Sequence, residues 1–106
     1  TGDRPAQPGE GIAIWHGDVK KRWNSKGKRA FYTHNIVQGP ERVHETQKPL
    51  GLMVELIEDF TDPGELILDP YAGSGTTGVA AKACGRRAIL IERREKDCES
   101  IVKRLA

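Results

Sequence analysis

The residues best suited to chemistry lie in the segment LDPYAGSGTTG, Leu68 to Gly78. A carboxylate, Asp69, ends a run of apolar residues, and glycines mixed with hydroxyl side chains follow it. The glycines satisfy the pattern G-x-G-x-x-G from Gly73 onward, and Glu92 lies 19 residues after Gly73. An acid at this distance typically accepts hydrogen bonds from ribose hydroxyls. The segment therefore predicts a loop that binds a ligand containing a nucleoside.

Several kinds of loop carry such glycines, and Asp69 discriminates between them. A P-loop needs a lysine where Val79 stands. A dinucleotide site of the nicotinamide or flavin type would place its pyrophosphate against the negative charge of Asp69. S-adenosylmethionine has cationic ammonium and sulfonium groups, which suit Asp69, and a ribose, which suits Glu92. Its carboxylate would bind the loop amides, the hydroxyls of Ser74 or Thr76, and a helix N-terminus. The sequence favours this ligand over the dinucleotides and over a tight turn without a ligand.

The elements that must position this loop form a βαβ unit. We expect strands at Leu66–Asp69 and Ala88–Glu92, separated by a helix over residues 76–84 that stops at Gly85. A closing helix has an apolar face of Cys98, Ile101, Val102 and Leu105. Two apolar strands joined through a helix indicate an α/β fold with a parallel sheet covered by helices.

A further helix is predicted directly upstream of the first strand. Pro49 suits the first helical position, and Thr46 is a possible cap. The apolar residues recur at helical spacing and make one face; they are Leu50, Met53, Val54, Ile57 and Phe60. The acidic residues Glu55, Glu58 and Asp59 are expected largely off that face.

These motifs together resemble those of the amino-group DNA methyltransferases, which methylate adenine N6 or cytosine N4. LDPYAGSGTTG is similar to the family's cofactor loop D-P-F-x-G-S-G-T-T, with Tyr71 in place of phenylalanine. HETQKP, His44 to Pro49, is similar to its H-P-T-Q-K-P segment, with Glu45 in place of proline. GRRAILIERREKDCESIVKRL resembles its second βα unit. The resemblance implies a Rossmann-like S-adenosylmethionine-dependent methyltransferase fold, here as a partial parallel sheet with flanking helices.

The resemblance also implies a set of site residues. Those lining the cofactor are Asp69, Gly73, Ser74, Gly75 and Thr76, with Glu92 on the ribose and Thr46 and Lys48 near the methionine. Arg93 would pack on the adenine through its guanidinium plane or leave that contact to another group. The family's catalytic tetrapeptide, [D/N/S]-P-P-[Y/F/W], is missing because the chain contains no Pro-Pro pair. We therefore expect no catalytic residue in this chain, and we expect the remainder of the enzyme to supply the tetrapeptide.

The first part of the chain is predicted to face DNA. Residues 1–48 hold nine Lys or Arg against five Asp or Glu, whereas residues 49–106 hold eight against ten. The candidate DNA contacts are Lys20, Lys21, Arg22, Trp23, Lys26, Lys28 and Arg29. The alternative is a solvated loop whose tryptophan packs on the domain. We expect residues 1–43 to be a loop-rich basic segment that ends a target-recognition region, with a short strand at Ile12–Trp15, and residues 44–106 to be the cofactor-binding region.

Length and composition limit the remaining possibilities. The 106 residues allow one domain at most, and 37% apolar with 30% charged residues is typical of a soluble globular protein. No segment approaches the ~20 apolar residues of a membrane span, so we expect a cytoplasmic protein. Two cysteines predict reduced thiols, and the three histidines lack metal-ligand spacing. Two other functions stay open: a non-catalytic remnant that binds cofactor or DNA, and, more distantly, a Rossmann oxidoreductase.

Overall fold

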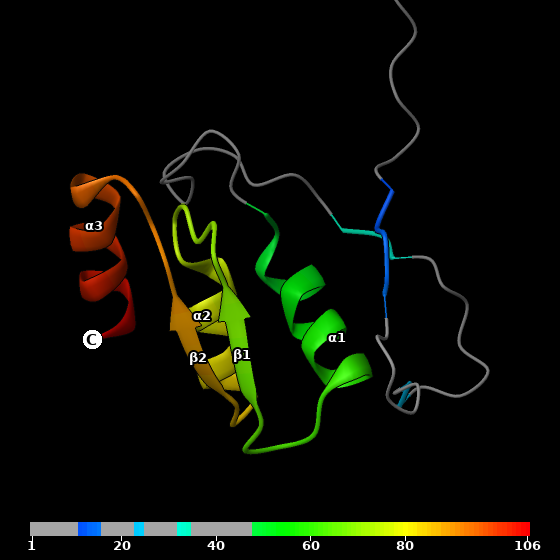
Figure 1. Cartoon of the computed structure of the whole chain (residues 1–106). Coiled ribbons are helices and arrows are strands. Elements are labelled where there is room, and N and C mark those ends of the chain that lie inside the picture. The colour runs from blue at the N-terminus through cyan, green and yellow to red at the C-terminus, as the bar shows by residue number, and fades with distance from the viewer. Residues whose placement is uncertain (1–10, 16–22, 25–31, 35–47) are drawn as a thin grey trace, which may run out of the picture.

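The computed structural model describes residues 11–15, 23–24, 32–34 and 48–106. Its elements in chain order are α1 (Leu50–Phe60), β1 (Leu66–Asp69), α2 (Thr76–Ala83), β2 (Arg87–Leu90) and α3 (Glu95–Leu105). In Figure 1 the two strands lie side by side with α2 behind them, and α1 and α3 stand on opposite sides. The predicted α/β architecture, a partial parallel sheet with flanking helices, is confirmed.

The sheet is a parallel pair in which Leu66 lies opposite Arg87 and Leu68 opposite Ile89. Side chains alternate between its faces, as the pleat requires. On one face Ile67 and Ala88 pack toward α2, whose Ala80 and Ala81 are completely buried. On the other face the apolar side chains stay about half exposed, at 50% for Leu66, 61% for Leu68, 49% for Ile89 and 52% for Ile91. The described core therefore fills only one side of the sheet.

Small residues let α2 approach the sheet closely. A Cβ added to Gly78 would lie 2.5 Å from Leu90 Cδ1, inside any real carbon contact. Ala80 and Ala81 join Ile57 of α1 in the buried core. The absence of side-chain bulk along α2 thus sets the short distance between the helix and β2.

The helices differ from the sequence expectations at several positions, among them Leu50, which was expected on the apolar face of α1 and is 40% exposed. Pro49 is the N-cap of α1, with φ −60° and ψ 132°, so the helix begins one residue later than predicted. Asp59, expected off the apolar face, is only 4% exposed because its Oδ2 accepts a 2.7 Å hydrogen bond from the Tyr32 hydroxyl. Val102, expected on the apolar face of α3, is 69% exposed, whereas Ile101 is buried. Hydrogen bonds and packing against neighbouring elements determine which of these residues are buried, and helical periodicity in the sequence reveals neither.

Short pieces of the N-terminal part pack against α1. Asn24 caps the C-terminal end of that helix. Its side-chain amide donates to the carbonyl oxygens of Glu58 and Thr61 at 2.9 and 2.8 Å. Trp23 packs on Phe60 with ring centroids 5.1 Å apart. These contacts join residues distant in sequence to the C-terminal end of α1.

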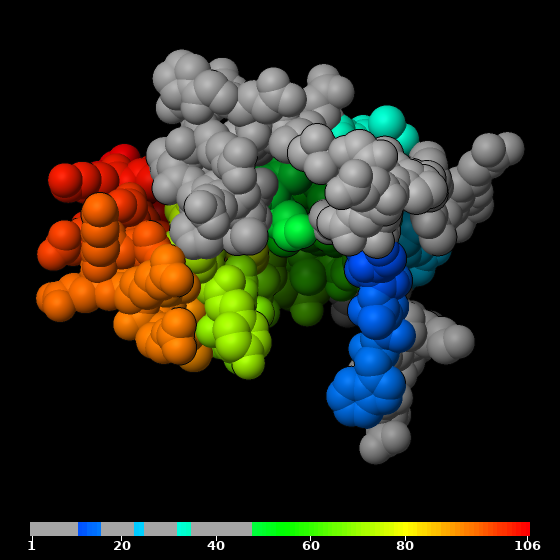
Figure 2. All heavy atoms as spheres, turned by 90° about the horizontal axis from the view of Figure 1, so that it is seen from above, coloured from blue at the N-terminus to red at the C-terminus, as the bar shows by residue number. Residues whose placement is uncertain are grey.

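The strand predicted at Ile12–Trp15 is wrong: residues 11–15 form no strand and all are exposed. No described strand lies beside them to accept ladder hydrogen bonds, which a strand needs. Figure 2 shows this segment, in blue, projecting from the body of the molecule. Trp15 at its end is 89% exposed.

Both cysteines are free and half-buried, as expected of reduced thiols. Burial, with a smaller contribution from Glu58, raises the pKa of the Cys84 thiol, and the nearby Arg86 offsets part of this rise. Among the described helices, none is long and apolar enough to cross a membrane.

Candidate functional site

The glycine-rich loop leaves the carboxyl end of β1 and turns back into α2. Asp69 starts the turn, since its Oδ1 accepts a hydrogen bond from the Tyr71 amide at 3.0 Å. Gly73 and Gly75 then take φ values of 55° and 82°, in the left-handed region that favours glycine. The Ala72 amide donates to the Ile91 carbonyl at 2.9 Å, which fastens the loop to the chain beyond β2. The loop is thus shaped by its own backbone, with the carboxylate at its entry.

Glu92 brings the second predicted carboxylate to the same loop. Its Oε1 accepts from the Gly73 amide at 3.0 Å, and its Oε2 accepts from the Arg94 amide at 2.8 Å. A carboxylate offers about four lone-pair sites, so one such group can accept several hydrogen bonds at once. The two acids follow neighbouring parallel strands at their carboxyl ends, the edge where ligands of such sheets bind.

Ser74 and Thr76 are held by a residue that the sequence did not single out. They are 6% and 5% exposed, and their hydroxyl oxygens lie 3.2 Å apart. Arg104 Nη1, from α3, lies 2.9 Å from the Ser74 carbonyl oxygen, 3.3 Å from Ser74 Oγ and 3.1 Å from Thr76 Oγ1. Burial lowers the pKa of Arg104. The one sequence signal for this role is that Arg104 lies three residues after Ile101, on the same face of the helix.

The N-terminus of α2 has the character of an anion site. Gly75 is its N-cap and provides no side-chain cap, and the first turn contains no acidic residue. The first amides of a helix lack internal partners and carry the positive end of its dipole. A carboxylate ligand at the loop would meet these amides.

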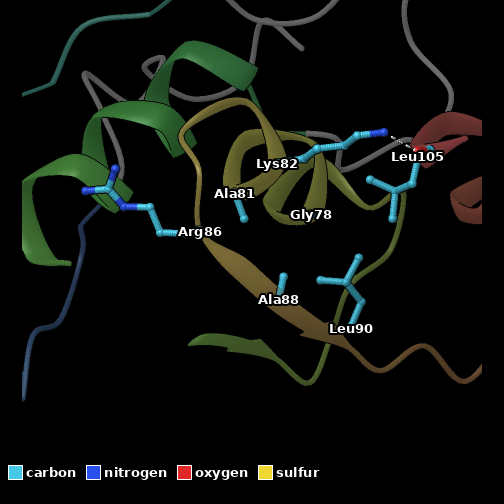
Figure 3. Close-up of a pocket in the computed structure, with 7 residues that line it drawn as sticks. All are labelled: Gly78, Ala81, Lys82, Arg86, Ala88, Leu90 and Leu105. Atoms are coloured by element: carbon cyan, nitrogen blue, oxygen red, sulfur yellow. Dashed lines mark hydrogen bonds between the residues drawn. The ribbon is translucent and has the colours of Figure 1, made fainter. Parts of the chain in front are cut away.

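A separate hollow of about 370 Å³ lies beside α2 and β2, away from these carboxylates. Figure 3 shows Gly78 and Ala81 of α2 facing Ala88 and Leu90 of β2, with Leu105 at one end. Arg86 points away from the hollow and binds the carbonyl oxygens of Thr61 and Cys84 instead. The lining of the hollow thus combines small and apolar residues with two cationic ones, Lys82 and Arg86.

Several predicted site residues are exposed, pack against other residues, or lie outside the described residues. Lys48 is exposed next to the N-cap of α1, and Arg93 is exposed after Glu92. Trp23 packs on Phe60, which is the packed alternative to a DNA contact. Thr46 and the other basic candidates, Lys20, Lys21, Arg22, Lys26, Lys28 and Arg29, lie outside the described residues. Within the described part of the chain, no group of three His, Cys, Asp or Glu side chains could hold a metal ion.

Several known DNA methylases are similar to this chain. A family model described as DNA methylase, N6_N4_Mtase, matches residues 10–103. The type II methyltransferase M.HinfI of Haemophilus influenzae is 39% identical over 88 residues, which cover 76% of this chain and 24% of that protein. The putative methylase YubD of Escherichia coli K12 is 49% identical over 65 residues, covering 61% and 29%. This chain thus spans about a quarter of the length of these curated relatives.

Solved structures with the same fold include methyltransferases. The M1.HpyAVI–SAM complex superposes with a TM-score of 0.67 at 38% identity, covering 81% of this chain and 44% of that one. A putative DNA modification methylase from Thermus thermophilus, complexed with S-adenosyl-L-methionine, gives a TM-score of 0.53 at 40% identity, covering 55% and 24%. With a family model matching most of its length, the chain belongs to the N6/N4 DNA methylase family.

Proposed function

We propose that this chain is the cofactor-binding portion of a DNA methyltransferase that transfers the methyl group of S-adenosylmethionine to adenine N6 or cytosine N4. The observation that carries the proposal is the glycine loop at the carboxyl edge of a parallel strand pair, with Asp69 at its entry and Glu92 beside Gly73. Membership of the DNA methylase family supports it. We propose that the protein acts in the cytoplasm, on DNA as its substrate.

The donor and acceptor groups of the loop fit this cofactor. The Asp69 carboxylate supplies a negative charge for the ammonium group, and its Oδ1 already holds the turn through the Tyr71 amide. The Glu92 carboxylate, an acceptor of several hydrogen bonds beside Gly73, suits the ribose hydroxyls. The amides at the start of α2 suit the methionine carboxylate. In this proposal Gly73 and Gly75 line the cofactor with their backbone, and Thr46 and Lys48 contribute near its methionine.

The structure modifies the proposed role of two residues. The buried hydroxyls of Ser74 and Thr76 contact each other and Arg104. We therefore assign their contribution chiefly to the shape of the loop and to the amides they carry.

The bound cofactor supplies an activated methyl group, because its sulfonium sulfur is positively charged. The residues of this chain bind and orient that cofactor, so that the target amine can attack in line with the carbon–sulfur bond. We propose that the polar residue of a Pro-Pro tetrapeptide in the remainder of the enzyme accepts hydrogen bonds from the target amine, while its aromatic residue stacks on the flipped base.

The exposed face of the sheet supports the existence of such a remainder. Leu66, Leu68, Ile89 and Ile91 are each about half exposed on the side away from α2. Parallel sheets are normally covered on both faces, because their strands are apolar throughout. The chain spans about a quarter of its curated relatives, which is room enough for further elements. We propose that the catalytic part of the enzyme covers this face.

DNA is the proposed macromolecular substrate, and we propose that the two parts of the chain bind DNA and cofactor respectively. Residues 1–43 would end the target-recognition region and residues 44–106 would bind the cofactor. The basic residues between Lys20 and Arg29 would contact phosphates, which predicts affinity that falls steeply with salt concentration. Replacing Lys20 and Lys21 by glutamine should reduce the slope of log K against log salt by about 2. An unchanged slope would remove these lysines from the interface.

One other function is favoured by a specific observation. The absence of a Pro-Pro pair from the 106 residues is also expected of a remnant that binds cofactor or DNA without turnover. The oxidoreductase alternative is excluded by the family assignment.

Methyl transfer from labelled cofactor to DNA separates these functions, with the full-length protein that contains this sequence. Asp69→Asn keeps an oxygen for the Tyr71 amide and removes only the charge, and Glu99→Gln is the matched change at an exposed position of α3. We expect Asp69→Asn to raise the cofactor Kd about tenfold, since hydrogen bonds between charged groups contribute roughly 1.5–3 kcal/mol. Cofactor binding without methyl transfer would identify a remnant, and no binding at all would reject the proposed function.

A further inference from the structure

The last helix of the chain reaches back onto the glycine loop through one face. Ile101, Arg104 and Leu105 share that face at helical spacing. A Cβ added to Gly75 would lie 2.9 Å from Ile101 Cγ1, and one added to Gly78 would lie 3.5 Å from Leu105 Cδ1. The helix therefore touches the loop and the start of α2 on the same side.

Arg104 is the polar member of this face, and its contacts converge on one point of the loop. A single nitrogen, Nη1, meets the Ser74 carbonyl oxygen at 2.9 Å, Thr76 Oγ1 at 3.1 Å and Ser74 Oγ at 3.3 Å. These acceptors flank Gly75, whose φ of 82° makes the turn into α2. The contact thus spans the residue at which the loop changes direction.

The position of this guanidinium calls for an explanation, because electrostatics alone opposes it. The N-terminus of a helix carries partial positive charge and repels cations. Burial lowers the pKa of Arg104, which reflects the cost of removing its charge from water. The side chain stays there because the loop offers oxygen acceptors, and hydrogen bonds from charged donors are the strong ones.

We propose that Arg104 is a positioning residue for the cofactor: it holds Ser74 and Thr76 so that the loop amides and one hydroxyl proton face the ligand. Each hydroxyl has one proton and accepts from Arg104. One of these protons makes the 3.2 Å bond between the two hydroxyls, and the other is left to donate elsewhere. This inference rests on the proposed function, since it concerns the binding of the same cofactor.

A matched pair of variants tests the proposal in the full-length protein. Arg104→Met keeps the length of the side chain and removes the donors. Lys82→Met removes another cationic tie to the same helix, because Lys82 Nζ donates to the Leu105 carbonyl at 2.7 Å without touching the loop (Figure 3). Binding of S-adenosylhomocysteine is measured by titration calorimetry, and thermal denaturation is recorded for each variant.

We expect Arg104→Met to raise the Kd about tenfold or more, from the strength of charged hydrogen bonds, and Lys82→Met to change it less than about twofold. Arg104→Lys should recover part of the affinity, because it keeps a cationic donor without the planar fork. In the methylation assay KM for the cofactor should rise, while kcat at saturating cofactor stays within about twofold. A contact that only stabilises the fold would not raise KM for the cofactor while leaving kcat unchanged.

The coupling to the loop is measured by combining Arg104→Met with Thr76→Val. Non-additive effects on the Kd support action through the Thr76 hydroxyl. Equal Kd values in the parent, Arg104→Met and Arg104→Lys would overturn the inference while leaving the proposed function intact. Equal losses in Arg104→Met and Lys82→Met would overturn it too, because they would indicate general loosening of α3. A parent protein that binds no cofactor would reject the proposed function and, with it, this inference.

Discussion

Replacing Glu92 by glutamine probes a side chain that serves both the loop and the proposed ligand. The carboxylate accepts backbone hydrogen bonds from Gly73 at 3.0 Å and from Arg94 at 2.8 Å. Glutamine offers one oxygen and one NH₂ group, so one of the two amides loses its acceptor. The half-buried Gly73 amide should keep the oxygen, because the exposed Arg94 amide can bind water instead. We expect a stability loss of only about 1 kcal/mol.

The effect on the cofactor should be larger. A ribose hydroxyl that donates to the carboxylate would lose a charged acceptor, which is worth roughly 1.5–3 kcal/mol. A loss of about 2 kcal/mol corresponds to an increase of about 30-fold in Kd. Calorimetric titration with S-adenosylhomocysteine measures this, with Glu99→Gln on the exposed side of α3 as the control.

A modified ligand separates the two roles of Glu92. Removal of the 2′-hydroxyl from S-adenosylhomocysteine should weaken binding to the parent protein much more than binding to Glu92→Gln, because the variant has already lost part of that contact. The same penalty in both proteins would refute the ribose contact and leave Glu92 with a role in the loop alone. An unchanged Kd in Glu92→Gln would refute both roles.

The remaining predictions concern stability, measured by denaturant titration of the full-length protein. Gly75→Ala should lower the free energy of unfolding more than Gly64→Ala. Both residues have φ above 80°, but only at Gly75 would the new Cβ meet a side chain, at 2.9 Å. Equal losses of stability in the two variants would argue against this packing. Gly78→Ala should destabilise by about 1–3 kcal/mol through overpacking against β2, and a neutral effect would show that the contact relaxes. Tyr32→Phe should cost roughly 1.5–3 kcal/mol, because buried Asp59 loses a donor. Burial, and then the hydrogen bond to Asp59, raise the pKa of Tyr32 above its ordinary value of 10.0, so the folded state retains a proton that the unfolded chain releases. The stability from this pKa shift is present below pH 10 and declines as the pH rises above it. Tyr32→Phe should flatten that decline. An identical dependence of stability on alkaline pH in the parent and the variant would contradict the role given to Tyr32.

Local patterns predicted the elements around the loop because those patterns are strong. The strand at Leu66–Asp69 has the predicted bounds. The helix after the loop ends at Ala83, one residue before its predicted end, and the second strand is Arg87–Leu90 where Ala88–Glu92 was expected. The apolar runs, the glycines and the acids at the strand ends are each visible within a few residues. The carboxylates at Asp69 and Glu92 lie at the loop for the same reason, since parallel strands place their carboxyl ends at one edge.

Contacts between distant residues account for the failures. The strand predicted at Ile12–Trp15 had suitable residues but no described partner strand beside it. Asp59 has the charge of a surface residue and is nevertheless buried, because Tyr32 reaches it from 27 positions away. Trp23 packs on Phe60 in the structure, and its contact with DNA stays a prediction.

The sequence by itself determined the kind of ligand loop, because glycine spacing and a preceding aspartate are local facts of the chain. Only the tertiary structure decided what holds that loop in place. Arg104 is 30 residues from Ser74 in sequence and reaches it because α3 folds back over the start of α2. Such a contact depends on the packing of whole elements, and no spacing within one segment encodes it.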